Sequence, residues 1–167
     1  SVNHPLLGLD LSQGTLSSGL LRAIEASQPG SIVSIGAPAG PNGKLYIAGK
    51  VLGHDEIQLF SGTSPDGVDI ELEFTGVLET VDGSIGFNAG VNAEIKGDVL
   101  ARGAGSDVIL SSDESLTLRG LVEADRNVSI ESGATVDPAL ASVTIEATSE
   151  IRSLGGGGEV TITGLNS

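Results

Sequence analysis

The sequence predicts an all-β protein, a parallel β-helix (β-solenoid) of about five to six coils with a short N-terminal capping helix. Three observations predict this fold. A short apolar motif recurs along the chain, its glycines are 27, 21 and 23 residues apart, and glycine is abundant at 25 residues. Repeat spacings of this size are typical of stacked architectures, and abundant glycine fits a chain with many tight turns.

In the recurring motif, apolar residues occupy positions one, three and seven, and glycine occupies position five. The motif occurs as Leu45-Ile47-Gly49-Val51, Leu72-Phe74-Gly76-Leu78, Ala93-Ile95-Gly97-Val99 and Leu116-Leu118-Gly120-Val122. A fifth copy, Val143-Ile145, has Ala147 in place of glycine. Because such a short strand cannot bury its apolar face alone, we expect strands of successive coils to pair in parallel. An antiparallel β-sandwich is the alternative, since short strands and glycine-rich turns also permit it.

A second alternating apolar pair follows each copy of the motif. These pairs are Ile57-Leu59, Ile85-Phe87, Val108-Leu110, Val128-Ile130 and Val160-Ile162. In stacked coils the apolar positions line up as columns inside the tube. We expect one column of Ile47, Phe74, Ile95, Leu118 and Ile145, and another of Leu59, Phe87, Leu110, Ile130 and Ile162. The alternating residues Glu71, Glu73, Lys96, Arg119 and Glu146 are expected to face water, and the repeated glycine is expected where a coil bends sharply or packs tightly.

Residues 1–30 differ from the remainder and are expected to form an N-terminal cap segment, with the solenoid repeats in 31–167. Leu16, Leu20, Leu21 and Ile24 recur at helical spacing, and Pro29-Gly30 is a stop signal. This pattern predicts a short amphipathic helix over about 18–27 that covers the open end of the stack. A helix that docks a partner is the alternative.

Composition limits the possible partners. The net charge of −14 makes binding to nucleic acid or to an anionic membrane surface improbable. The absence of cysteine excludes disulfides, thiol catalysis and cysteine-based zinc sites. No stretch approaches the roughly 20 apolar residues that a membrane-spanning helix needs, so membrane insertion is not expected.

The sequence contains only weak candidates for catalytic residues. Glycoside hydrolysis usually needs two carboxylates across the scissile bond, but a chain with 22 acidic residues produces such pairs by chance. The pairs by sequence are Asp55/Glu56, Asp69/Glu71/Glu73 and Asp113/Glu114. His54 beside Asp55 and Glu56 is better explained as a solvated turn than as a metal site. We therefore expect no enzymatic activity and no cofactor.

Calcium has somewhat better support from the sequence. The segments 64–69 and 103–107 place aspartates in turns, where backbone carbonyls add the hard oxygen ligands that calcium prefers. The candidate ligands are Asp66, Asp69 and Asp107. Calcium-binding repeats of this kind occur in tandem, and this chain has a single degenerate copy, so plain turns are the simpler interpretation.

Two segments carry a family resemblance. Ala93-Glu94-Ile95-Lys96-Gly97-Asp98-Val99 followed by 106–110, and Leu118-Arg119-Gly120 followed by 127–130, resemble the repeats of filamentous haemagglutinin-type bacterial exoproteins. The resemblance covers about 44–163. It implies a right-handed β-helix that is exported to the bacterial cell surface and serves in adhesion, aggregation or matrix building.

These observations lead to a functional expectation. We expect a non-enzymatic, extracellular structural or adhesive β-solenoid that self-associates or joins neighbouring modules of the same protein, and that can assemble end to end into fibres or matrix. The alternative is a recognition module that binds a glycan or host protein through the loops 62–67, 103–107 and 133–142. A polysaccharide-acting enzyme is a more distant alternative, because some parallel β-helices have that activity.

Overall fold

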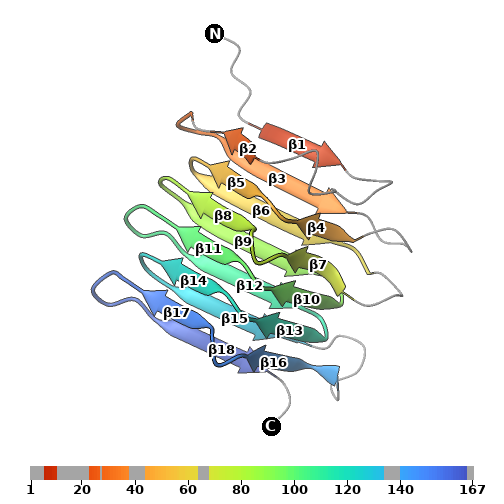
Figure 1. The fold of residues 1–167 in the computed structure, drawn as a ribbon. Helices are drawn as coiled ribbons and strands as arrows, with labels where there is room; N and C mark the ends of the chain where they lie inside the picture. Colours follow the sequence, from red (N-terminus) through yellow and green to blue (C-terminus); the bar gives the residue numbers. More distant parts are fainter. Residues whose placement is uncertain are drawn as a thin grey trace.

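The chain winds into a β-solenoid. The computed structural model describes residues 6–10, 23–26, 28–37, 44–63, 68–133 and 140–164, and these contain strands of three sheets. Each turn of chain contributes one strand to each sheet in succession, so the three sheets form the walls of a tube with residues 6–10 near one end and residues 160–164 near the other (Figure 1).

The three sheets contain seven, six and five described strands. Sheet A consists of β1 (Leu6–Asp10), β3 (Ile32–Ala37), β6 (Glu56–Ser61), β9 (Ser84–Ala89), β12 (Val108–Ser112), β15 (Val128–Ser132) and β18 (Val160–Gly164). Sheet B consists of β2 (Ala23–Ala26), β5 (Lys50–Gly53), β8 (Val77–Thr80), β11 (Asp98–Ala101), β14 (Leu121–Ala124) and β17 (Glu150–Ser153). Sheet C consists of β4 (Leu45–Ile47), β7 (Val68–Leu72), β10 (Asn92–Ile95), β13 (Ser115–Leu118) and β16 (Ser142–Ile145).

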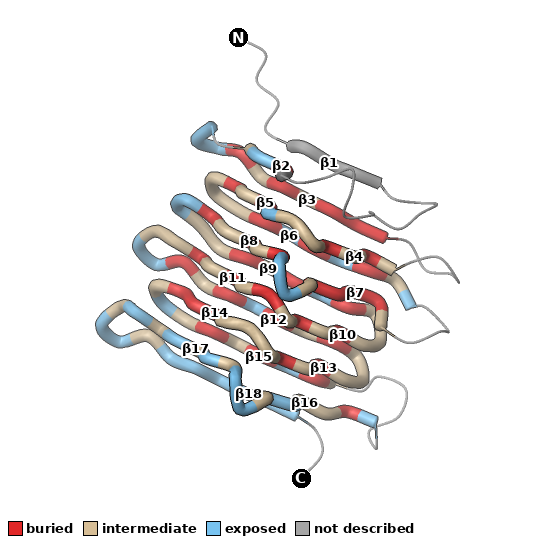
Figure 2. Tube along the Cα trace, in the orientation of Figure 1, coloured by how far each residue is buried: buried red, intermediate tan, exposed pale blue. Residues whose placement is uncertain are grey.

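Every strand pairing among the described residues is parallel. This confirms the predicted parallel solenoid and excludes the antiparallel sandwich. Four turns, from β4 to β15, enclose a continuous apolar core, which Figure 2 shows as buried positions recurring from coil to coil. The expectation of five to six coils for the whole chain, and the right hand of the helix, stay predictions.

The core is built from columns of in-register apolar residues. The predicted column in sheet A is confirmed: Leu59 pairs with Phe87, Phe87 with Leu110, Leu110 with Ile130, and Ile130 with Ile162. The first four of these side chains are at most 2% exposed. Since alternate residues of a strand point to opposite faces, one residue in two along each strand enters the core.

The predicted column in sheet C was wrong at one position. Leu72, and not Phe74, lies between Ile47 and Ile95. Phe74 is 66% exposed, in a turn between β7 and β8 that is two residues longer than the turns between β4 and β5, β10 and β11, and β13 and β14. Thr75 holds this turn in place by donating a hydrogen bond from Oγ1 to the carbonyl of Ala48 at 2.7 Å. The prediction aligned the copies of the motif on their glycines. Because two extra residues precede Gly76, this alignment placed Phe74 in the column where Leu72 lies.

The predicted N-terminal helix over 18–27 was also wrong where the structure describes it. Residues 23–26 form strand β2, which pairs with β5 so that Ile24 lies in register with Val51. Ile24 is buried against the core, and this tertiary contact outweighs the helical spacing of the leucines before it. The predicted residues 18–22 and 27 lie outside the described residues, and no α-helix occurs within the described ranges.

The repeated glycines lie at a corner where neighbouring coils touch. A Cβ added to Gly97 would come within 2.1 Å of the carbonyl oxygen of Gly76, and one added to Gly120 within 1.9 Å of that of Gly97. The obstructing atoms are backbone, so they cannot yield as a flexible side chain could. The sequence prediction of tight packing at these glycines is confirmed.

We expect Gly97→Ala to destabilise the protein by about 1–3 kcal/mol, because the added methyl group forces two coils apart. Gly86→Ala is the matched control, since its Cβ would meet only one atom, at 4.0 Å. The control is expected to be neutral or to stabilise by about 0.4–1 kcal/mol. Urea denaturation of both variants measures the difference, and equal stability of the two would contradict close packing at this corner.

Candidate functional site

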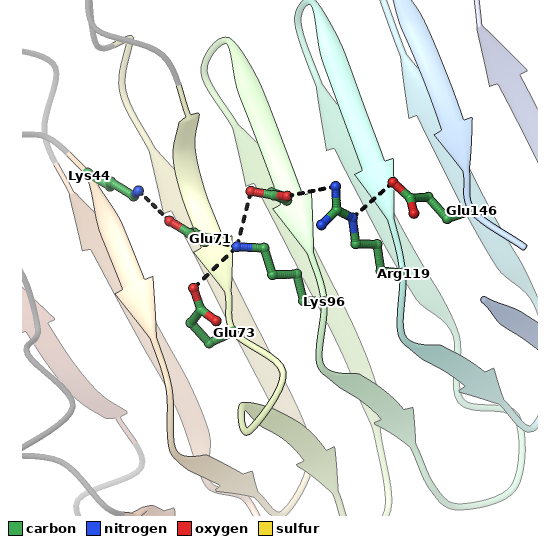
Figure 3. Close-up of polar contacts among 7 residues, drawn as sticks. Lys44, Glu71, Glu73, Lys96, Arg119 and Glu146 are labelled. Atoms are coloured by element: carbon green, nitrogen blue, oxygen red, sulfur yellow. Dashed lines mark hydrogen bonds and ion pairs between the residues drawn. The ribbon is translucent and has the colours of Figure 1, made fainter. Parts of the chain in front are cut away.

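Ion pairs join successive coils along the outside of the tube. Each of the seven lysines and arginines in the described ranges contacts at least one carboxylate. On sheet C these contacts form a continuous chain that crosses five strands, shown in Figure 3. Its members in order are Lys44, Glu71, Lys96, Glu94, Arg119 and Glu146.

Lys96 is the centre of this chain. Its ammonium lies 2.5 Å from a carboxylate oxygen of Glu71, 3.2 Å from one of Glu73 and 3.3 Å from one of Glu94 (Figure 3). It also lies 5.9 Å from the ring centroid of Phe74, close enough for a cation–π contact. Its hydrogen bond with Glu71 is the largest influence on the pKa of Lys96 and raises it, although burial opposes the effect.

Glu71 is a buried acid whose pKa is strongly shifted. Burial disfavours its charged form, but hydrogen bonds from Lys44 and Lys96 outweigh burial and lower the pKa of Glu71 from 4.5 to about 2. The carboxylate therefore stays ionised through mildly acidic conditions. Because Lys44 precedes β4 and Lys96 follows β10, Glu71 joins three consecutive coils.

A second chain of ion pairs runs along sheet B. Arg102 contacts Glu79 at 3.9 Å and also pairs with Glu123, which Arg152 approaches to 3.5 Å from the other side. Lys50 pairs with Glu79 and Arg152 with Glu150 at the two ends of this chain. The Glu123 side chain is only 6% exposed, so its two arginines offset the loss of hydration.

Sequence reasoning missed these chains. Glu71, Glu73, Lys96, Arg119 and Glu146 were expected simply to face water, whereas Glu71 is buried and Lys96 is largely covered. The signal was present in part in the alternation, because charged residues lie next to apolar positions of the motif at Glu94, Lys96 and Arg119. These ion pairs can be recognised only when it is known which residues of successive coils lie in register.

We expect Glu71→Gln to remove part of the acid sensitivity of folding. The folded-state pKa of Glu71 lies below its ordinary value, so its contribution is present above about pH 4.5 and is lost as the pH falls toward 2. From pH 7 to pH 3 the native protein should lose about 2 kcal/mol more stability than the variant. Urea titrations at both pH values measure this, and parallel losses would contradict the assigned role of Glu71.

Of the predicted calcium ligands, Asp69 and Asp107 each have hydrogen-bond partners within the protein. Asp69 is buried and accepts a hydrogen bond from the backbone N–H of Asn92 at 3.1 Å. Asp107 accepts from Arg126 Nε at 2.9 Å and from the Asn127 N–H at 3.0 Å, and the arginine, opposed by burial, lowers the pKa of Asp107. Asp66 lies outside the described residues, which contain no group of three or more potential metal ligands. Calcium binding stays a prediction.

The predicted carboxylate pairs are mostly engaged elsewhere. Glu71 and Glu73 both hold Lys96, and Asp55 contacts Nδ1 of His54 at 2.9 Å. The loop 103–107 is described and contains two glycines with positive φ, whereas parts of the loops 62–67 and 133–142 lie outside the described residues.

A shallow groove lies on the outer face of sheet A. It has a volume of about 340 Å³ and is lined by Phe60 and Ile109, both about half exposed, and by the polar side chains of Gln58 and Asn88. Gly86 forms part of its floor, and Glu56 is its one charged lining residue. Such a surface can accept a neutral polar ligand, although it lacks the enclosure of a typical small-molecule site.

The most unusual surface is the C-terminal coil, β16 to β18, which we call the open end. Here Ile145, Val160 and Ile162 are 41%, 40% and 46% exposed, whereas the residues in the same columns one coil earlier are fully buried. Those buried residues are Leu118, Val128 and Ile130. Figure 2 shows the change from buried to exposed between β15 and β18. Within the described residues, the apolar columns are therefore covered in β13 and β15 and about half exposed in β16 and β18.

The chain matches no protein-family model, and neither a curated protein nor a solved structure is significantly similar to it. Within the described ranges, no helix is long and apolar enough to cross a membrane.

Proposed function

We propose that this chain is a non-enzymatic, exported bacterial surface protein, a structural and adhesive β-solenoid that assembles end to end. The observation that carries the proposal is the open end, where the core columns finish in half-exposed Val160 and Ile162. Bacterial export and the right hand of the helix rest on the resemblance to filamentous haemagglutinin-type repeats.

The open end has the physical requirements of an assembly surface. It presents both an apolar patch and the edge of parallel sheets, and unpaired strand edges readily template pairing with another chain. Full burial of a Val or Ile side chain stabilises by roughly 1.5–3 kcal/mol, and covering the exposed part of Ile145, Val160 and Ile162 supplies a share of this. A contact between different surfaces produces an open filament when the rotation between successive copies does not close a ring, as when copies stack along the axis of the tube.

The ion-pair chains support a structural role. They use six of the seven described lysines and arginines to link neighbouring coils, so these charged groups stabilise the rod and are not grouped around a cleft. Single exposed ion pairs contribute little, but connected networks with buried members contribute more. The remaining excess of acidic residues keeps the sides of the rod mutually repulsive and directs association to its ends.

The groove on sheet A favours the second candidate function, a recognition module. Phe60 supplies an aromatic face and Gln58 and Asn88 supply amide groups, the chemistry that contacts a neutral glycan. Saturable binding of neutral oligosaccharides that Phe60→Ala abolishes, in a protein that stays monomeric, would favour this function over assembly.

We expect Ile162→Lys to block assembly, because a charge in a core column opposes the burial that drives it. Ile109→Lys is the matched control: Ile109 is 51% exposed, close to the 46% of Ile162, but lies on the outer face of sheet A away from the open end. Sedimentation velocity and negative-stain microscopy across a concentration series should show filaments of uniform width for the native chain and for the control.

For Ile162→Lys the expected result is a single folded species at every concentration. Circular dichroism establishes that both variants retain the fold. Monomeric native protein at all concentrations, or equal assembly of the two lysine variants, would contradict the proposed function.

A further inference from the structure

The open end also indicates which strand of a second copy it takes. We propose that β18 of one copy pairs in parallel with β1 of the next copy, so that sheet A continues across the junction. This inference rests on the proposed end-to-end assembly and adds to it a specific partner strand and register.

The two strands are the opposite ends of one sheet. Sheet A runs in the order β1-β3-β6-β9-β12-β15-β18, so β1 and β18 each have one neighbour among the described strands. At the N-terminal end, sheet A reaches further than sheet B, because β1 precedes β2 in the winding order. β1 is therefore the first described strand that a second copy would meet when its N-terminal end approaches β18 (Figure 1).

The register positions of the two strands match. Following the pairings through the sheet, Leu7 begins the column that ends at Val160, and Leu9 begins the column that ends at Ile162. Pairing Leu7 with Val160 and Leu9 with Ile162 would continue two columns that contain only apolar residues. A slip of one residue would place the apolar positions on opposite faces, so this register is strongly preferred.

The backbone hydrogen bonds specify the same register. The N–H groups of Ile85, Val108 and Val128 each donate at 2.9 Å to a carbonyl of the following coil. The acceptors are Asp107, Asn127 and Glu159, each of which immediately precedes the next residue of that column. Val160 is the next donor in this series. Continued by one coil, the pattern directs its N–H to the carbonyl of Leu6 in the second copy.

A two-fold contact between two open ends is the competing arrangement, and charge disfavours it. Residues 140–164 carry three carboxylates and one guanidinium, so like-charged coils would face each other. Such a contact would also pair β18 with itself in an antiparallel direction, whereas all the pairings within the described part of the solenoid are parallel. Tail-to-tail association would form closed dimers and no filament.

Disulfide cross-linking tests the register directly, because the chain has no cysteine of its own. Positions 10 and 163, and positions 8 and 161, lie in common columns across the proposed junction. Paired strands are about 4.8 Å apart, within the Cα separation of about 4.4–6.8 Å that a disulfide needs. The in-register double variants are Asp10→Cys/Thr163→Cys and Gly8→Cys/Thr161→Cys.

The matched control is Asp10→Cys/Thr161→Cys, which uses the same positions displaced by two residues. That displacement separates the Cα atoms by roughly 8 Å, too far for a disulfide. At concentrations where the native chain assembles, mild oxidation should give a reducible ladder of dimers, trimers and higher species from both in-register variants. We expect at least tenfold less product from the control.

The outcomes separate the two proposals. Assembly without preferential in-register cross-linking would overturn the β18–β1 pairing and leave end-to-end assembly standing. Cross-linked dimers from Thr163→Cys alone would overturn it in favour of tail-to-tail association. If the native chain fails to assemble in sedimentation velocity, the proposed function and this inference both fail.

Discussion

The structure depends on parallel pairing of each coil with the next in a constant register. This pairing satisfies the backbone hydrogen bonds of each strand and stacks one apolar side chain directly on another, as in the column from Leu59 to Ile130. A coil cannot achieve either alone, because its strands are only three to six residues long. Stability therefore accumulates along the axis from contacts between neighbours, as in other repeat proteins.

The same register determines the electrostatics of the surface. Stacking places carboxylates of successive coils close together, as with Glu71 and Glu94, and would cause repulsion in a chain with net charge −14. Lys96 and Arg119 lie among these carboxylates and convert the repulsion into a chain of ion pairs. The lowered pKa of Glu71 is a direct consequence, because two lysines hold one buried carboxylate from both sides.

Features of the structure that depend on the local sequence pattern could be predicted, whereas features that depend on contacts between coils could not. The motif's alternation and spacing were sufficient to predict the parallel solenoid and the column through Phe87, because both depend on local pattern and period. Phe74 and the segment 23–26 were misassigned. In the first case the corner turn had gained two residues, and in the second the contact of Ile24 with the core outweighed helical spacing. The ion-pair chains require the exact partners between coils, which a single sequence does not specify.

The open end could be anticipated only in part. A strand that ends near residue 164 was visible in the sequence, but the exposure of Val160 and Ile162 depends on how the last coil is covered. The same two residues would be ordinary core positions if another coil lay on them, as Val128 and Ile130 are one coil earlier. Their exposure is the observation on which the proposed linear assembly rests.

Residue-resolved hydrogen exchange tests the central claim most directly, namely that in-register stacking continues from one copy to the next at β18. The account predicts that in dilute protein the amide of Val128 exchanges slowly while those of Val160 and Ile162 exchange quickly. In concentrated, assembled protein the Val160 and Ile162 amides should become protected to a level near that of Val128. Strong protection of these two amides in dilute protein, or no change on assembly, would contradict the account.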